Sequence, residues 1–308
     1  MSRLAAVDVG TNSVLLLVAE RGLDGVVRPV REEADITRLG RGVDRTGLLS
    51  DEGMEATLEV LARYAALARA DGARALVVIA TSAARDARNG AEFLDRARER
   101  AGATVEILSG SEEARLSYLA VARDFGAEAG APGLLAIDVG GGSTELVHGS
   151  GDTVLFRVSL DIGSVRLTER CVRSDPPAPR EQEAVRAAVR AALARLPTFP
   201  RGARAVGVAG TVTSLFAIAQ AIEPYDAGRV HGGWLSMADI ARVRAQLCAL
   251  PLPERKLLPG MQPKRADVLP AGALLFETVL SHLDLPGAHV SDRGLRWGVL
   301  LDRWETLA

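Results

Sequence analysis

The chain has 308 residues, of which 48% are hydrophobic and 25% are charged, and its formal net charge is −2. These values exclude a disordered chain and a globally basic nucleic-acid binder, and the length is enough for two domains that each bury a core. The two cysteines, Cys171 and Cys248, lie far apart with no CxxC spacing. They predict neither a disulfide framework nor a zinc site, and fit a reducing compartment.

The first residues enter an apolar run at once, without the long apolar core or cleavage site of a signal peptide. Apolar runs such as Val14–Ala19 are far below the length that crosses a membrane. We therefore expect a cytoplasmic protein with neither a membrane nor a nucleic-acid partner.

An internal repeat is the most informative feature of the sequence. Residues 6–18 read AVDVGTNSVLLLV, and residues 136–147 read AIDVGGGSTELV, so Asp, Val, Gly and Ser recur in one register. A solenoid would need three or more short repeats, whereas two copies at the heads of two half-chains indicate a duplicated lobe.

The residues after the first glycine turn decide between two kinds of glycine motif. Val14–Ala19 is a β-like run, residues 21–25 form a turn, and Val26–Val30 is a second β-like run. A dinucleotide-binding or P-loop glycine motif would open directly into a helix instead. The glycines therefore belong to a hairpin, as in actin-like ATPases.

The rest of the chain alternates between predicted strands and helices, which indicates α/β lobes with mixed sheets. We expect helices over 51–70 (capped by Ser50), 93–100, 112–125 and 181–196, another helix starting after Ala209-Gly210-Thr211, and strands over 75–80, 105–108 and 205–208. The Ala- and Gly-rich segment 126–133 is the expected boundary between a first lobe, 1–126, and a second lobe, 127–308.

Both hairpin tips are candidate phosphate sites, because glycine lets backbone N–H groups approach an anion and Ser or Thr hydroxyls add donors. The first tip contains Gly10, Thr11, Asn12 and Ser13, and the second contains Gly140, Gly141, Gly142, Ser143 and Thr144. A single copy would fit a plain β-turn that needs positive φ. Two copies, each preceded by an Asp, favour phosphate binding.

Three carboxylates near the tips are candidate metal ligands: Asp8, Asp138 and Glu145. An Asp at the end of a buried strand is costly unless its charge is used, and Mg²⁺ with phosphate is a common use, with Mn²⁺ as the alternative. The competing interpretation is a carboxylate that accepts hydrogen bonds from backbone N–H groups of the turn.

Residues 109–113 read SGSEE, and Ser109 with Glu112 fits a helix capping box. From spacing alone, both glutamates are best explained by the helix dipole, although a Glu beside a phosphate site could position the attacking water. Arg85 and Arg293 could each donate to phosphate oxygens, and each alone is better explained as a surface arginine. The four histidines share no metal-ligand spacing and receive no catalytic role.

As a set, these residues resemble the exopolyphosphatase and guanosine pentaphosphate phosphohydrolase (Ppx/GppA) family, which belongs to the acetate kinase, sugar kinase, Hsp70 and actin superfamily. The resemblance covers almost the whole chain. It rests on DVGTNS at 8–13, ATSAARDA at 80–87, LSGSEEARL at 108–116, DVGGGSTE at 138–145, AGT at 209–211, RAD at 265–267, AGA at 271–273 and SDRGLR at 291–296.

The resemblance implies two actin-like (ASKHA, ribonuclease H-like) lobes with mixed sheets and an interlobe cleft. It implies Glu113 as general base, and Asp138 and Glu145 at Mg²⁺ with Asp8 nearby. The implied phosphate-binding residues are Thr11, Asn12, Ser13, Arg85, Gly141, Gly142, Ser143 and Thr144, with Gly210 and Thr211 on the far side of the path. The implied reaction releases terminal orthophosphate from inorganic polyphosphate.

Long relatives carry a further helical C-terminal region with an HD-type domain, for which this sequence has no counterpart, so we expect a preference for shorter polyphosphates. A homodimer is an expectation by analogy. Three other functions remain open on the sequence: hydrolysis of the 5′-γ-phosphate of pppGpp, a sensor that binds without turnover, and a kinase. The sequence shows no acceptor site for a kinase, and Glu113 does not favour the sensor.

Overall fold

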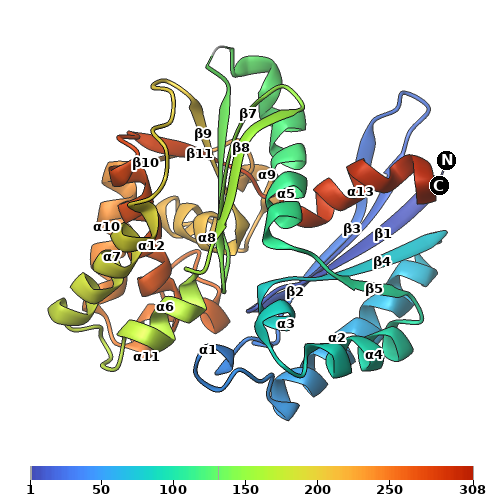
Figure 1. The fold of residues 1–308 in the computed structure, drawn as a ribbon, viewed down its shortest axis with the longest axis horizontal. Helices are drawn as coiled ribbons and strands as arrows, with labels where there is room; N and C mark the ends of the chain where they lie inside the picture. The colour runs from blue at the N-terminus through green and yellow to red at the C-terminus, as the bar shows by residue number, and fades with distance from the viewer. Residues whose placement is uncertain (1, 131, 308) are drawn as a thin grey trace. The chain divides into compact units, whose positions relative to one another are not determined.

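A computed structural model describes residues 2–130 and 132–307, and these residues divide into two compact units (Figure 1). The first unit comprises the residues up to Ala120 together with those from Leu295 onward, and the second comprises Val121–Gly294. The chain therefore passes from one unit to the other twice.

This division corrects the expected lobes in one respect. The boundary was expected in segment 126–133, of which residue 131 lies outside the described residues, but the division falls at 120/121 and residues 295–307 join the first unit. The physical reason is the final helix, α13 (Leu295–Leu307), which packs along the first strand (Figure 1). Its Arg296 pairs with Glu32 at 3.0 Å, and its Arg303 pairs with Glu106.

The first unit begins with a meander of three antiparallel strands and continues with alternating helices and strands. Its elements are β1 (Ser2–Val9), β2 (Ser13–Arg21), β3 (Val27–Ile36), α1 (Val43–Thr46), α2 (Asp51–Ala70), β4 (Ala75–Ala80), α3 (Ser82–Asp86), α4 (Gly90–Ala101), β5 (Thr104–Ile107) and the start of α5 (Gly110–Phe125). The strand order is β3-β2-β1-β4-β5, with β4 and β5 parallel to β1.

The second unit repeats this plan with one strand added at an edge. Its elements after α5 are η1 (Gly126–Glu128), β6 (Leu134–Val139), β7 (Thr144–Ser150), β8 (Thr153–Leu160), α6 (Ser164–Cys171), α7 (Pro179–Leu193), β9 (Arg204–Val208), α8 (Ala209–Ala219), α9 (Ala227–Val230), β10 (Trp234–Ser236), α10 (Met237–Ala249), α11 (Leu252–Arg255), η2 (Pro263–Arg265), α12 (Leu269–His282) and β11 (Gly287–Val290). The strand order is β10-β11-β9-β6-β7-β8.

The five strands of the first sheet match five of the six strands of the second, which confirms the duplicated mixed α/β lobe predicted from the repeat. In the first sheet Val9 pairs with Val14 across the hairpin, and in the second Val139 pairs with Thr144 at the same position. The predicted hairpin meander is likewise observed, since β2 pairs antiparallel with β1 and β3 pairs antiparallel with β2. The Ser50 cap of α2 is also present, with Ser50 Oγ accepting from Gly53 N at 3.1 Å.

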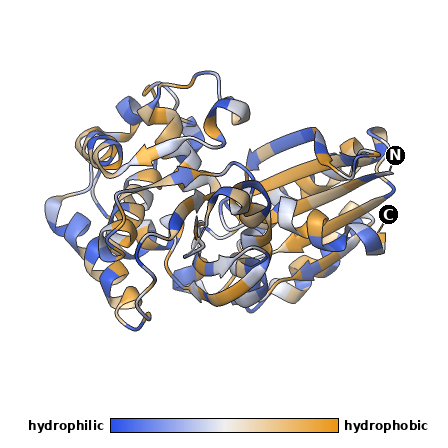
Figure 2. Cartoon of the chain, turned by 90° about the horizontal axis from the view of Figure 1, so that it is seen from above, coloured by the Kyte–Doolittle hydropathy of each residue, from blue (hydrophilic) through white to orange (hydrophobic). Residues whose placement is uncertain are grey.

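Alternation along the strands places apolar side chains on both faces of the first sheet. Ala5 and Val7 belong to a core with α2 and α4, whereas Leu4 and Ala6 belong to a second core with α5 and α13. Several strand ribbons are accordingly coloured hydrophobic over much of their length, whereas others carry hydrophilic stretches (Figure 2). Asp8 has the same parity as Leu4 and Ala6, so it lies at the end of β1 on the face covered by α5.

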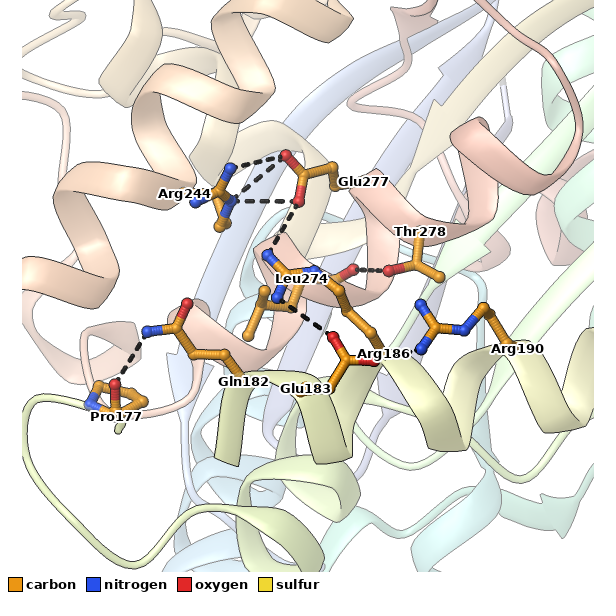
Figure 3. A network of polar contacts seen from close by, with 9 residues as sticks. All are labelled: Pro177, Gln182, Glu183, Arg186, Arg190, Arg244, Leu274, Glu277 and Thr278. Carbon is orange, nitrogen blue, oxygen red and sulfur yellow. Dashed lines mark hydrogen bonds and ion pairs between the residues drawn. The ribbon is translucent and has the colours of Figure 1, made fainter. Parts of the chain in front are cut away.

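The core of the second unit lies between its sheet and the helices α6, α7, α8, α10 and α12. A polar network connects three of these helices, α7, α10 and α12 (Figure 3). Glu277 of α12 accepts from Arg244 of α10 at 3.1 to 3.2 Å and lies 3.7 Å from Arg186 of α7. Arg186 in turn pairs with Glu183 at 3.9 Å, so one carboxylate, Glu277, connects the helix layer.

Among the described residues, no helix combines the length and apolar character that crossing a bilayer requires.

Candidate active site

The first glycine turn joins β1 to β2, and its carbonyl groups are held by the segment that follows β3. Gly10 N donates to Ser13 O at 2.9 Å, which closes the turn. Thr11 O accepts from Gly40 N at 2.8 Å, and Asn12 O accepts from Arg38 N at 3.0 Å. The residues predicted to bind phosphate are thus fixed by backbone contacts within their own unit.

The second glycine turn is closed in the same way, by Gly140 N donating to Ser143 O at 3.0 Å. Its carbonyl groups are held by the first turn of α6 rather than by a loop. Gly140 O accepts from Ser164 N at 3.0 Å, and Gly141 O accepts from the backbone N of Val165 and Arg166 at 2.9 and 3.2 Å. These contacts also satisfy N–H groups that every helix leaves without an intrahelical acceptor at its start.

Close approach of α6 to this turn requires glycine at position 163. A Cβ on Gly163 would lie 2.4 Å from the carbonyl carbon and oxygen of Gly141 and 2.6 Å from Gly142 N. Thr144 adds a further tie, because its hydroxyl donates to Ile162 O at 2.6 Å. The Thr144 hydroxyl proton is therefore used to hold the turn, so the predicted phosphate contact by this hydroxyl is not favoured.

The hydrogen bonds that hold the carbonyl groups of both turns also determine where their N–H groups point. In a trans peptide the C=O of one residue and the N–H of the next point in opposite directions. Gly142 O is held on the same side, since it accepts from Arg166 Nε of α6 at 2.7 Å. In the second turn the N–H groups of Gly141, Gly142 and Ser143 therefore face away from α6, and none donates to an acceptor among the described residues. Such a row of outward N–H groups is an anion-binding arrangement.

Two buried side-chain atoms in the first turn also have no partner within the described part of the chain. They are Thr11 Oγ1 and Asn12 Nδ2, and both residues are less than one-tenth exposed. A buried donor without an acceptor costs free energy, and native proteins satisfy nearly all such groups with protein, water or ligand. Two together beside a glycine turn indicate a place for a ligand rich in oxygen atoms.

Arg85 and Glu113 meet in the first unit because the strands before them are parallel neighbours. α3 follows β4 and α5 follows β5, so both helices begin at the same edge of the sheet. Arg85 Nη1 lies 3.2 Å from Glu113 Oε2 and donates to Leu108 O at 3.0 Å. Its Nε lies 3.8 Å from Asp86 Oδ1, and its Nη2 donates no hydrogen bond to an acceptor among the described residues, so that end of the guanidinium suits an anion.

The neighbouring Glu112 is engaged elsewhere. Arg115 donates to both of its carboxylate oxygens, at 2.7 and 3.0 Å, and also to Asp302 of α13 at 2.9 Å. Ser109 Oγ accepts from Glu112 N at 3.2 Å, as the capping box predicts for that side chain. The helix-end interpretation therefore fits Glu112, and Glu113 is the one brought to Arg85.

Asp138 and Glu145 are the two carboxylates that the second unit brings together. They are direct cross-strand partners on β6 and β7, and Glu145 is buried, with Oε1 accepting from Ser159 Oγ at 2.6 Å. Like charges directly opposite on a sheet are unfavourable, and a shared cation removes the repulsion. The position opposite Asp8 is Leu15, so the first unit lacks this pairing.

A pair of carboxylates fits Mg²⁺, which takes one or two carboxylates and completes its shell with water and phosphate oxygens. A protein cage of three or more His, Cys, Asp or Glu side chains is not found within the described residues. The carboxylates present therefore suit a cation held jointly with an anionic ligand.

The turn between β9 and α8 is strained, and the guanidinium of Arg265 packs against it. Ala209 has φ of 70°, a left-handed conformation that is costly for a residue with a Cβ. The next residue, Gly210, has Arg265 packed against it, so a Cβ there would lie 2.2 Å from Arg265 Nη1. Burial lowers the pKa of the Arg265 guanidinium, which remains charged at neutral pH. Thr211, the residue after Gly210, is buried.

The alternative considered for Arg293, donation to phosphate oxygens, is not favoured by its contacts. Arg293 Nη1 pairs with Asp124 Oδ1 at 3.0 Å, and its backbone is held by Ser291 Oγ. In contrast, three residues that contact the candidate site residues were not singled out from the sequence: Arg265, Arg166 of α6 and Ser159. Arg265 had a signal, since it lies in a segment that matches the family, whereas Ser159 and Arg166 have no counterpart in the repeat.

The fold and these sites define a duplicated α/β protein of the actin-like architecture that is built to bind phosphate. A model described as the Ppx/GppA phosphatase family matches residues 17–307. Exopolyphosphatase 2 of Mycobacterium tuberculosis (strain CDC 1551 / Oshkosh) is 40% identical over 294 residues, which cover 92% of this chain and 91% of that protein. The chain belongs to the Ppx/GppA phosphatase family.

Solved structures agree with this assignment. One of an exopolyphosphatase-like protein has a TM-score of 0.90 and 32% identity, and covers 99% of this chain and 100% of that one. The Aquifex aeolicus member of the Ppx/GppA family has a TM-score of 0.80 and 34% identity, with 99% and 98% covered. The expectations of an actin-like α/β fold and of a phosphoanhydride hydrolase are thereby confirmed.

Proposed function

We propose that the protein is a magnesium-dependent exopolyphosphatase that releases terminal orthophosphate from inorganic polyphosphate. The proposal rests mainly on the two glycine turns. In each turn the carbonyl groups accept hydrogen bonds from neighbouring residues, so the N–H groups of the turn point away from those residues. Each turn by itself is an anion-binding arrangement that suits a phosphate group. The exopolyphosphatase named among its relatives at 40% identity supports the same substrate.

In the proposed reaction Glu113 acts as the general base. It accepts a proton from water as the water oxygen bonds to the terminal phosphorus and the bond from that phosphorus to the bridging oxygen breaks. The shortened chain leaves with the bridging oxygen and its electron pair. Arg85, Asn12 and the outward N–H groups of the turns stabilise the negative charge on the phosphoryl oxygens.

Asp138 and Glu145 are the residues that would hold Mg²⁺, or Mn²⁺ in its place, and Asp8 remains a candidate carboxylate at the first glycine turn. The cation, when bound, would neutralise charge on the phosphate oxygens. In this proposal Ser159 keeps Glu145 in position, since its hydroxyl donates to Oε1.

The test is orthophosphate release by the purified protein in Mg²⁺, measured with tripolyphosphate, long polyphosphate, pppGpp and ATP at equal terminal-phosphate concentration. We expect the highest kcat/KM with polyphosphate, and with the shorter chain of the two. A preference for pppGpp would replace polyphosphate with an alarmone as the substrate. Release from none of the four, with binding retained, would make the protein a sensor and contradict the proposal.

A further inference from the structure

The two glycine turns hold corresponding carbonyls in different ways. In the repeat, Asn12 corresponds to Gly142. Asn12 O accepts from a backbone N–H, that of Arg38, at 3.0 Å, whereas Gly142 O accepts from a side chain, Arg166 Nε, at 2.7 Å. The second turn therefore depends at this point on the identity of one residue, which can be changed without altering the backbone.

The glycine run has particular need of such a contact. Gly140, Gly141 and Gly142 carry no side chains, and glycine loses more conformational freedom on ordering than any other residue. The contacts to Gly140 O and Gly141 O come from backbone N–H groups of α6, but none of these reaches Gly142. Among the described residues, the guanidinium of Arg166 is the group that donates to the carbonyl of Gly142.

We propose that Arg166 is a positioning residue for phosphate binding, which acts through the carbonyl of Gly142. By holding this oxygen on the α6 side, Arg166 directs the Ser143 N–H to the opposite side, where it faces the anion. Arg166 is half-buried and lies three residues into the helix, so it is anchored by the same element that holds the other two carbonyls. Preorganised donors lower the cost of binding an anion.

This inference rests on the proposed function only for the choice of substrate. The test compares Arg166→Met, Arg166→Lys and the control Arg170→Met, one helical turn further on and exposed. Tripolyphosphate is the probe in two measurements: the rise in melting temperature that it causes, and the steady-state kinetics of orthophosphate release. The rise in melting temperature depends on binding and does not depend on turnover. A protein that binds tripolyphosphate without hydrolysing it therefore still tests Arg166.

We expect Arg166→Met to raise KM by about tenfold, the scale of one lost hydrogen bond, with a smaller effect on kcat, and to lose most of the ligand-induced rise in melting temperature. Arg166→Lys keeps a donor and should fall between Arg166→Met and wild type. Arg170→Met should behave as wild type.

Several results would overturn the inference. One is a lower melting temperature of Arg166→Met without ligand, combined with an unchanged KM and an unchanged ligand-induced shift, which would assign Arg166 to stability alone. Another is an equal loss in Arg170→Met. If Arg166→Met does not fold, Arg166→Lys decides, and wild-type values in that variant contradict the inference. A wild-type protein that is stabilised by tripolyphosphate but releases no orthophosphate would end the proposed function and leave this inference standing.

Discussion

Arg85 Nη1 lies 3.2 Å from Glu113 Oε2, and the same nitrogen donates to the carbonyl of Leu108. The second contact fixes the guanidinium to the backbone at the end of β5, so it cannot follow the carboxylate if that moves. Both side chains are mostly removed from solvent, with exposed fractions of 23% and 11%. The proposed base is therefore held in a defined position by a cation that itself suits phosphate.

Changing Glu113 to Gln should remove proton transfer while keeping the shape of the side chain. We expect kcat to fall by about 10²-fold or more, with KM for tripolyphosphate little changed, because the loss is confined to general-base catalysis. The control is Glu112→Gln, whose carboxylate is bound by Arg115 away from Arg85. Steady-state release of orthophosphate checks both, and an equal loss in the two variants would remove Glu113 from the role of base.

Truncation of Asn12 should weaken substrate binding more than it weakens the fold. Asn12 Nδ2 is buried without an acceptor among the described residues, so Asn12→Ala removes no hydrogen bond of this donor within them. A donor to a charged group contributes about 1.5–3 kcal/mol, so KM for tripolyphosphate should rise by about 10- to 100-fold.

The matched control for Asn12 is Asn89, whose side-chain amide is fully engaged with one backbone residue. It donates to Leu49 O at 3.0 Å and accepts from Leu49 N at 2.8 Å. Asn89→Ala should lower the free energy of unfolding more than Asn12→Ala does, and leave KM at the wild-type value. If both variants change KM alike, the orphaned amide of Asn12 is not a substrate contact.

The meander and the glycine turns were predictable from the sequence because they are local. A turn with an Asp before it and a β-like run after it has one good geometry, and Gly10 and Gly140 close their turns with nearly the same distance, 2.9 and 3.0 Å. The unit to which α13 belongs was not predictable in this way. Its buried Trp297 and Trp304 give a helical period whichever sheet they cover, and the deciding ion pairs, to Glu32 and Glu106, join residues about 200 or more apart.

The site shows the same limit. Spacing alone assigned both Glu112 and Glu113 to the helix end, and only the parallel pairing of β4 with β5 brings Glu113 to Arg85, 28 residues earlier in the chain. Strand register likewise distinguishes the two hairpins. Asp138 on β6 has Glu145 of β7 directly opposite, whereas Asp8 on β1 has Leu15 of β2 opposite. A pattern of residue types locates candidate groups, whereas strand pairing decides which of them meet.

Glu277 should be important for the stability of the second unit. Its side chain is 14% exposed and pairs with Arg244 and Arg186 (Figure 3). Glu277→Gln therefore leaves the partly buried Arg244 without a charge partner among the described residues, and leaves Arg186 with the more exposed Glu183. We expect the free energy of unfolding to fall by about 2–3 kcal/mol. The control, Glu183→Gln in the same network, is 59% exposed and should cost less than about 1 kcal/mol. Urea denaturation measures both, and equal losses would contradict the importance of burial here.

His289 should make the fold sensitive to mild acid. Its ring lies between Trp234 and Phe125, and burial, together with nearby Arg204, lowers its pKa below the ordinary value of 6.5. As the pH falls below about 6.5 the unfolded chain takes up a proton that the folded chain does not, so stability decreases towards the folded pKa.

Removing this imidazole with His289→Gln should therefore reduce the part of the melting-temperature loss that occurs between about pH 6.5 and pH 5. The measurement is the melting temperature of wild type and variant across that range, with His282→Gln, at an exposed position near the end of α12, as the control. Because the carboxylates titrate identically in all three proteins, the difference between the curves isolates His289. Parallel curves for wild type and His289→Gln would show that this half-buried ring does not couple folding to protonation.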